Sequence, residues 1–217
     1  TGQDVTMTII PVTTVVPSSQ TICSGTSTSI ELVSPVEGTI FEWTVLQSGI
    51  AGASSDSNKN IITQTLDAVG SSFGTAVYNV NPSASGCAGI PIQVPVTVNL
   101  PVTVNAGVDV KINYGKSVQL GGSPAGTEGA VFVWTPSTGL SDAFVGNPTA
   151  NPILRTSYEL TASITSNGIT CLAKDTVLVS VSPPAYPING FTPNGDGIND
   201  VWEIDFLADY PDCIVEI

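Results

Sequence analysis

The sequence contains no histidine, and only 5 of its 217 residues are lysine or arginine. The absence of histidine removes the commonest general base, the usual zinc ligand and every Ser-His or Cys-His dyad. With 18 acidic residues the formal net charge is −13, and such a chain repels phosphate backbones. Nucleic-acid binding is therefore not expected. Divalent cations and basic surfaces are better-matched partners.

Charged residues make up only 11% of the chain and aromatic residues only 6%. No apolar run reaches the roughly 18 residues needed to span a membrane. The hydrophobic content of 41% is nevertheless enough to fill cores. Ser, Thr, Asn and Gly supply the polar surface, which is typical of an extracellular β-protein. The chain begins at Thr1 without a signal peptide, so we expect a mature or excised fragment.

Alternating Val- and Thr-rich runs dominate the sequence, as at Val5–Ile10, Val94–Val98 and Val177–Val181. Apolar spacing of period two predicts half-buried strands. Gly, Pro, Asn and Ser clusters separate these runs, and no segment combines a helical period with caps. The sequence therefore predicts an all-β chain built from β-sandwiches.

The chain also repeats itself with a period of roughly 90 residues, the size of one sandwich domain. Pro-Val-Thr starts both copies, and Ile and Gly follow at equal offsets. An aromatic-x-Trp motif, a Tyr and a Cys recur later in each copy. The matched pairs are Pro11 and Pro101, Ile22 and Ile112, Gly25 and Gly115, Trp43 and Trp134, Tyr78 and Tyr158, and Cys87 and Cys171. The predicted parts are the last strand of a preceding repeat at 1–10, sandwiches at 11–100 and 101–182, and a linker with a terminal segment at 183–217.

The terminal segment carries the most specific motif. Phe191–Trp202 reads FTPNGDGINDVW, and Tyr210–Ile217 reads YPDCIVEI. It resembles the start of the type B, gliding-motility-associated C-terminal sorting domain that Bacteroidota use for type IX secretion. The family's domain continues further, so we expect 183–217 to be its N-terminal part. The resemblance implies export to the cell surface and contact with the translocon, a PorV-like shuttle and an outer-membrane protein of the PorP/SprF family. The residues expected to be recognised are Phe191, Pro193, Gly195, Gly197, Trp202, Tyr210 and Pro211.

Both repeats resemble PKD-like units of Bacteroidota surface proteins. The first carries Thr21–Gly25, Phe41–Trp43 and Ser85–Cys87, and the second carries Trp134–Ser141 and Thr156–Tyr158. The resemblance implies Ig-like sandwiches that act as spacers. We therefore expect a non-catalytic stalk of a surface-attached adhesin, similar to gliding-motility adhesins of the SprB type. The alternatives are a spacer beside an upstream polysaccharide hydrolase and a module that binds extracellular glycans.

The cysteines can be assigned by analogy with Ig-like domains, which often bridge strands across the core. On that basis we predict a Cys23–Cys87 disulfide, worth roughly 4 kcal/mol on the chain-entropy model. The counterpart of Cys23 in the second repeat is Asn113, so Cys171 has no partner of that kind. Cys171 and Cys213 are then predicted to be buried thiols, with a Cys171–Cys213 bridge as the less favoured alternative.

Trp43 and Trp134 have two possible roles. They could be sugar-stacking platforms, or they could be the buried tryptophans of sandwich cores. Their matched positions beside apolar strand residues favour the core. The carboxylates are scattered through strands and turns, where a solvated role is the default. The sequence therefore neither predicts nor excludes a glycosidase site made of two of these carboxylates.

The acidic terminal segment also matches part of a calcium-loop template. Asn194, Asp196, Asp200 and Glu203 supply the oxygen ligands that calcium prefers, and Gly197 stands at the required turn. Thr192 replaces the first aspartate, so we predict weak calcium binding at these four residues. The alternative is a hydrogen-bonded turn, because Asn and Asp side chains readily accept nearby backbone amides.

Overall fold

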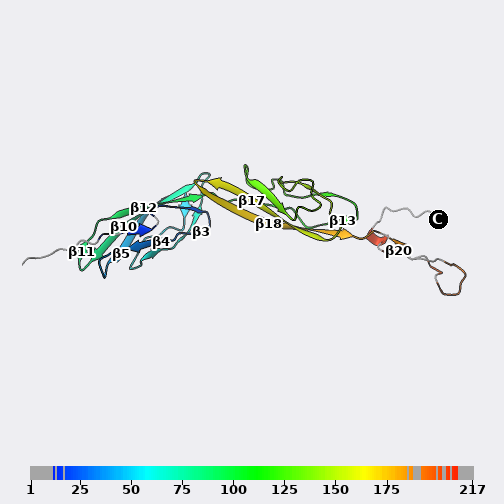
Figure 1. Cartoon of the computed structure of the whole chain (residues 1–217), viewed down its shortest axis with the longest axis horizontal. Helices are drawn as coiled ribbons and strands as arrows, with labels where there is room; N and C mark the ends of the chain where they lie inside the picture. The colour runs from blue at the N-terminus through cyan, green and yellow to red at the C-terminus, as the bar shows by residue number, and fades with distance from the viewer. Residues whose placement is uncertain are drawn as a thin grey trace, which may run out of the picture. The chain divides into compact units, whose positions relative to one another are not determined.

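The computed structural model describes residues 12, 14–16, 18–184, 186–187, 192–198, 200–201, 204–205 and 207–209. Within these residues the chain is all-β, apart from one short 3-10 helix, η1 (Leu207–Asp209) (Figure 1). It divides into two compact units. Unit 1 comprises residues 1–101 with 165–171, and unit 2 comprises residues 102–164 with 172–217. No helix in the described part of the chain is long and apolar enough to cross a membrane.

Unit 1 is a sandwich whose larger sheet has six strands. Their order is β2 (Gln20–Cys23), β12 (Ile92–Asn99), β10 (Gly74–Ala84), β5 (Ile40–Ser48) and β7 (Asp56–Ser57), with β11 (Cys87–Ala88) paired to β10. The other layer has two small sheets. One contains β1 (Thr14–Val16), β4 (Ile30–Val33) and β8 (Ile61–Ile62), and the other contains β3 (Thr26–Ser27), β9 (Thr65–Ala68) and β6 (Ile50–Ala51).

The core of unit 1 follows from strict alternation along its strands. In β10 every second residue from Gly74 to Val80 is buried, because successive side chains point to opposite faces. Val94, Val96 and Val98 of β12 point to the same side of the sheet, and they pack with Ile30 of the opposing layer. The alternating runs in the sequence thus become the inner face of the larger sheet.

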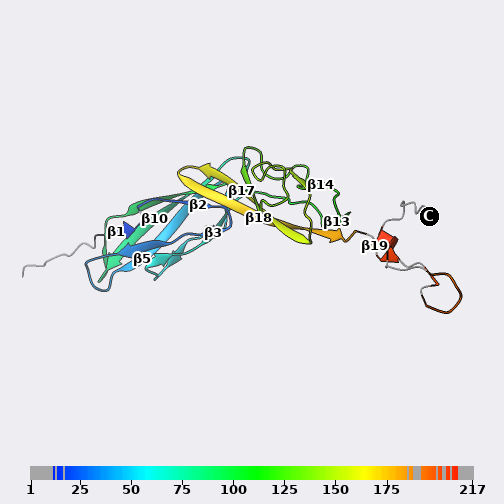
Figure 2. The same cartoon turned by 45° about the vertical axis from the view of Figure 1, so that its right-hand side comes forward.

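Unit 2 repeats this arrangement. Its main sheet has the order β13 (Val110–Asn113), β18 (Ile169–Ser182), β17 (Thr156–Ser166) and β15 (Val131–Thr135). Figure 2 shows β13 beside β18, to which it pairs in parallel, as β2 does to β12. The remaining strands are β14 (Val118–Gln119) with β16 (Thr149–Ala150), and β19 (Tyr186–Pro187) with β20 (Ile204–Asp205).

The registers of the two main sheets place several matched residues of the sequence repeat at equivalent positions. Cys23 is paired with Asn99 in unit 1, and Asn113 is paired with Ser182 in unit 2. Trp43 lies opposite Val80, two residues after Tyr78. Trp134 likewise lies opposite Leu160, two residues after Tyr158. The chain is therefore an all-β protein, and the main sheets of its two units share one strand order, β2-β12-β10-β5 in unit 1 and β13-β18-β17-β15 in unit 2.

Candidate functional site

The matched tryptophans lie in the two cores, with exposed fractions of 1% for Trp43 and 2% for Trp134. Each indole N–H donates to a backbone carbonyl, from Trp43 to Ser54 at 3.2 Å and from Trp134 to Val145 at 2.9 Å. A buried indole needs such an acceptor. The core prediction is confirmed, and neither ring face is available to stack on a sugar.

The matched tyrosines also belong to the cores. The Tyr78 hydroxyl donates to Gln64 Oε1 at 2.7 Å, and the Tyr158 hydroxyl donates to the Thr138 carbonyl at 2.9 Å. Burial raises the pKa of Tyr78 to about 12 and also raises the pKa of Tyr158. Both phenols are therefore neutral hydrogen-bond donors at neutral pH, not acid–base groups.

Several of the scattered carboxylates act as acceptors for backbone amides. Asp109 accepts from the Leu178 amide at 2.9 Å, and Asp142 accepts from Phe144 at 2.8 Å. Asp175 accepts from Ala106 at 2.8 Å. Such bonds satisfy backbone donors that would otherwise need water. Among the described residues, no group of three His, Cys, Asp or Glu side chains could hold a metal.

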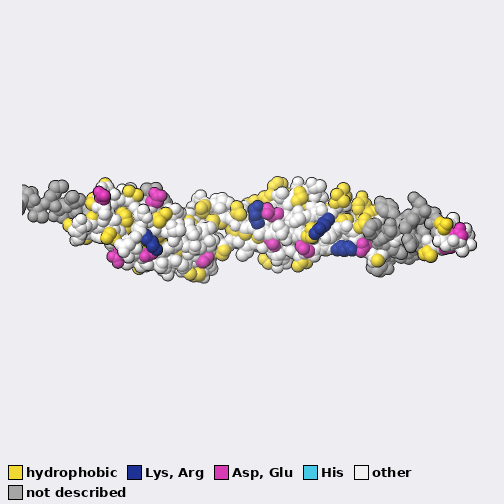
Figure 3. Space-filling model, turned by 90° about the horizontal axis from the view of Figure 1, so that it is seen from below, with side chains coloured by type: hydrophobic (Ala, Val, Ile, Leu, Met, Phe, Trp, Pro, Cys, Tyr) yellow, Lys and Arg dark blue, Asp and Glu magenta, His cyan; other side chains and the backbone are white. Residues whose placement is uncertain are grey.

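The cations are dispersed. All five are described, and three of them form ion pairs: Lys59 with Asp56, Lys111 with Asp209, and Lys174 with Glu159 at 2.6 Å. The face in Figure 3 is mostly uncharged, and its few cations do not gather into one patch.

Two hollows in the described part of the chain have no acidic side chain in their lining. One of about 250 Å³ is lined by Thr39, Ile40, Phe41, Asn58, Lys59 and Asn60. The other, of about 160 Å³, is lined mainly by apolar and glycine residues between Ala106 and Val177. Neither combines a general acid with a general base.

The acidic segment folds into a loop in which carboxylates collect backbone amides. Asp200 Oδ1 accepts from the amides of Asn194 at 3.0 Å and Gly195 at 2.7 Å, and its Oδ2 accepts from Gly197 at 2.6 Å. Asp196 Oδ1 accepts from the Ile198 amide at 2.8 Å. Gly195 and Gly197 have φ values of 76° and 81°, in the left-handed region that glycine tolerates.

These hydrogen bonds favour the ionised form of the Asp200 and Asp196 carboxylates. The Gly195 amide is the main cause that lowers the pKa of Asp200, and the Ile198 amide is the main cause that lowers the pKa of Asp196. Three of the four predicted calcium residues, Asn194, Asp196 and Asp200, thus meet in one loop. Glu203 lies outside the described residues. Calcium binding stays a prediction, while the hydrogen bonds match the alternative of a satisfied turn.

The residues predicted for recognition by the secretion machinery are placed only in part. Pro193, Gly195 and Gly197 lie on the exposed loop, next to exposed Ile198 and Val201. Outside the described residues lie Phe191, Trp202, Tyr210 and Pro211.

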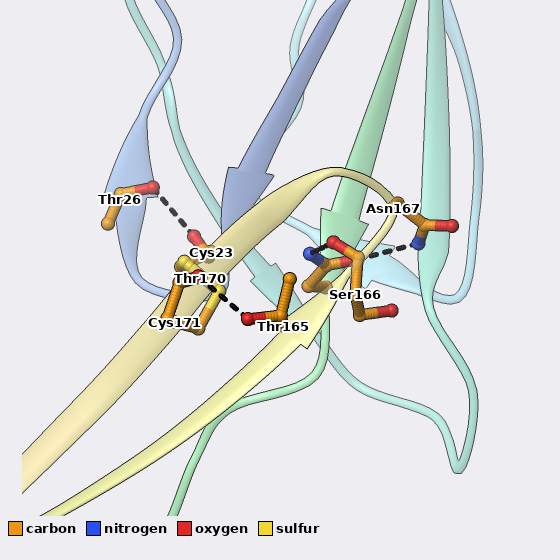
Figure 4. Close-up of a disulfide and its surroundings, with 8 residues drawn as sticks. Cys23, Thr26, Thr165, Ser166, Asn167, Thr170 and Cys171 are labelled. Atoms are coloured by element: carbon orange, nitrogen blue, oxygen red, sulfur yellow. Dashed lines mark hydrogen bonds between the residues drawn. A yellow bond between two sulfur atoms is a disulfide. The ribbon is translucent and has the colours of Figure 1, made fainter.

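A disulfide joins Cys23 to Cys171, with 5.6 Å between the two Cα atoms (Figure 4). Cys171 follows the tip of the β17–β18 hairpin, whose residues 165–171 belong to unit 1. Buried Asn99, the pairing neighbour of Cys23, donates to the Ser166 carbonyl at 2.8 Å. It also accepts from the Asn167 side chain at 2.8 Å. Unit 1 thus holds this tip by one covalent bond and two partly buried hydrogen bonds.

The predicted Cys23–Cys87 disulfide is wrong, since Cys87 is a free thiol and Cys171 takes its place. Cys23 follows Ile22, whose partner Val98 is paired in turn with Gly74 at the start of β10. Cys87 is paired with Ala84 at the other end of β10. Ten residues of extended strand span about 33 Å, whereas a disulfide needs Cα atoms within about 7 Å. The prediction that Cys171 is reduced is also wrong, because Cys171 is bonded to Cys23. Cys213 lies outside the described residues.

Residues 20–101 match the PKD-like domain family, which covers unit 1 from β2 to its last strand. The first unit is thus a PKD-like, Ig-type sandwich. No curated protein matches the sequence.

Several solved structures match the chain at low identity and low TM-score. The human desmocollin-1 ectodomain is 11% identical, with a TM-score of 0.34 over 82% of this chain and 43% of that one. Drosophila N-cadherin EC1-4 is 14% identical, with a TM-score of 0.29 over 76% and 47%. A SusE-like surface-located polysaccharide-binding protein of Bacteroides thetaiotaomicron is 8% identical, with a TM-score of 0.39 over 77% and 33%. The chain spans less than half the length of each.

Proposed function

We propose that this chain is a non-catalytic stalk segment of a surface-attached adhesin, and that its terminal segment is the cargo signal for type IX secretion. The observation that carries the stalk proposal is the Cys23–Cys171 bond. The bond joins residues with a sequence separation of 148, and the covalent ring that it closes contains most of both sandwich cores. A ring of this kind limits how far a pulled chain can lengthen, which is a useful property for a surface stalk.

Several described residues of the kinds used in catalysis make structural contacts instead, which is in line with the non-catalytic role that we propose. In the described residues, the carboxylates considered above serve backbone amides or ion pairs, and the matched tyrosines are neutral core donors. The glycan-binding alternative loses its best-placed aromatics, because Trp43 and Trp134 are buried. No particular observation favours a spacer beside a hydrolase over an adhesin stalk.

The cargo proposal rests on the FTPNGDGIND motif and on the exposed, amide-satisfied loop that it forms. The proposed partners are the type IX translocon, a PorV-like shuttle and an outer-membrane protein of the PorP/SprF family. A loop whose backbone is fixed by Asp200 presents a defined surface without needing a buried core of its own.

An export assay tests the cargo proposal. The substitution Asp200→Ala removes the acceptor of three loop amides, whereas Asp142→Ala removes the acceptor of one amide in unit 2 and is the matched control. Each is introduced into the protein as the exporting cell makes it, and surface protein is measured by protease accessibility on intact cells. We expect Asp200→Ala to accumulate in the periplasm and Asp142→Ala to reach the surface. Normal surface levels of Asp200→Ala would contradict the proposal.

A further inference from the structure

Cys87 occupies the same place in unit 1 as Cys171 does in its own hairpin. Cys87 is paired with Ala84, which is six residues after Tyr78. In the β17–β18 hairpin the Thr165 and Thr170 hydroxyls lie 2.8 Å apart across a turn at Asn167 and Gly168. The next pair outward is then Ile164 with Cys171, and Ile164 is six residues after Tyr158.

The two hairpins also turn in the same way. Ser85 and Gly86 have φ values of 50° and 78°, and Asn167 and Gly168 have 49° and 79°. Two consecutive positive φ values define the two-residue turn that suits the twist of a β-hairpin. The hairpin that carries Cys171 is longer by two residues on each arm. Those extra residues include Ser166, which receives the Asn99 hydrogen bond.

The two cysteines differ in their bonding. Cys171 is joined to Cys23, the last residue of β2, whereas Cys87 is free and only half buried. Cys23 itself lies about 33 Å along the sheet from Cys87, by the strand geometry given above. Within unit 1, Cys87 therefore sits at the end away from Cys23.

We propose that Cys87 forms a disulfide with the cysteine at the Cys23 position of a preceding unit of the same kind. The Cys171 bond is the independent observation that shows what this hairpin position does when such a cysteine is present. The matching Pro-Val-Thr starts at Pro11 and Pro101 indicate that units of this kind follow one another in sequence. The shorter Cys87 hairpin lacks a Ser166 equivalent, so the link there relies on the covalent bond.

The bond forms by thiol–disulfide exchange with a disulfide donor such as oxidised glutathione. The thiolate of one cysteine attacks the donor and releases one reduced glutathione. The second thiolate then displaces the other glutathione, which leaves one new S–S bond. The two protons that leave the cysteine thiols end on the two released glutathione thiolates, and the donor takes up the two electrons that the cysteines lose.

A tandem duplication tests the proposal within one molecule. Residues 11–100 are placed ahead of Pro11 of the chain, which recreates the Leu100–Pro–Val–Thr junction that naturally precedes unit 2. The added copy carries Cys87→Ser, and exposed Ser18→Thr marks its peptides. The chain itself carries Cys213→Ser. After refolding in a glutathione buffer, free thiols are alkylated and the unreduced peptides are mapped.

The native Cys23–Cys171 bond serves as the internal control for folding. We expect the marked Cys23 peptide to be linked to Cys87, and alkylation of Cys87 to fall at least tenfold from its level in the unduplicated chain. Full alkylation of Cys87 while Cys23–Cys171 forms would overturn the proposal, as would a bond from the marked Cys23 to Cys171.

If the duplicated chain does not form Cys23–Cys171, the same map is made on protein alkylated directly at the surface of exporting cells. A bond from Cys87 to a cysteine outside this sequence supports the proposal if that cysteine holds the place of Cys23 in a preceding unit. It must then be the last residue of the strand that corresponds to β2. Complete alkylation of Cys87, or any other partner for it, overturns the proposal.

Discussion

Reduction of the Cys23–Cys171 disulfide should greatly increase the length to which the chain can be pulled. When force acts on the two termini, tension passes from Cys23 directly to Cys171 through the S–S bond. The residues between them, with a sequence separation of 148, are then protected from extension. At about 3.5 Å per extended residue, this hides about 520 Å of chain.

Single-molecule force spectroscopy with handles at both termini measures this length. Oxidised protein should extend only through its terminal segments and the part of β18 that follows Cys171. Protein in reductant, or the Cys171→Ser variant, should reach a greater extended length. The increase should be about 520 Å minus the distance between Cys23 and Cys171 in the folded protein. The gain should come in the unfolding steps of the two sandwiches.

Cys87→Ser is the matched control, because Cys87 is a free thiol and its loss should leave the short extension unchanged. A Cys23–Cys87 bond would instead hide only about 220 Å, since 64 residues separate these positions in sequence. Equal extension with and without reductant would refute the bypass of tension. An increase caused by Cys87→Ser would show that Cys23 is paired with the wrong residue here.

Three further predictions concern the core and the acidic loop. Trp134→Ala should destabilise unit 2 by about 3–5 kcal/mol in urea unfolding. The control Phe144→Ala removes a side chain that is 72% exposed and should change stability by less than about 0.5 kcal/mol. Equal effects of the two substitutions would contradict the assigned core. Because the folded pKa of Asp200 is lowered from 3.8, its hold on the loop should be complete above pH 4 and lost as pH falls through the lowered value. The NMR shift of the Gly197 amide should report that midpoint, and a midpoint at or above 3.8 would contradict it. Calcium should shift the Gly195 and Gly197 amides saturably, with a Kd of about 0.1–1 mM or weaker, and Asp196→Ala should abolish the shift; no shift in the parent chain would leave the loop as a turn.

The sequence predicted the sandwiches because burial on one face of a sheet imposes a period of two that survives in the amino acids. The runs at Val94–Val98 and Val177–Val181 become central strands of the two main sheets. The equal offsets after Pro11 and Pro101 also matched Cys23 with Asn113, and the recurring aromatic-x-Trp motif matched Trp43 with Trp134. The strand pairing agrees with both matches.

The disulfide partner could not be found in this way. Alternation tells which face a residue occupies, but it does not tell which end of the sheet the residue reaches. Cys23 and Cys87 lie near the two limits of one repeat in sequence, yet their strands place them at opposite ends of β10. The Asn167–Gly168 pair was an available signal, because Asn-Gly favours a tight hairpin turn. Counting outward from it would have shown that Cys171 lies near a hairpin tip.

The acidic loop shows a different limit. Oxygen-rich spacing attracts both calcium and backbone amides, and residue types alone do not rank the two. In the structure Asp200 accepts three amides and Asp196 accepts one, so the loop is satisfied without an ion. A carboxylate oxygen has more than one lone pair, so Asp196 and Asp200 keep acceptor capacity for calcium while they accept these amides.

The pairing of Cys23 with Cys171 is the feature on which the tension bypass and the proposed link at Cys87 both depend. A peptide map of the protein, alkylated and digested without reduction, tests it most directly. The Cys23 peptide should be linked to the peptide that contains Cys171, and Cys87 should carry the alkyl label. A Cys23 peptide linked to Cys87, with Cys171 alkylated, would contradict the pairing and with it the proposed stalk.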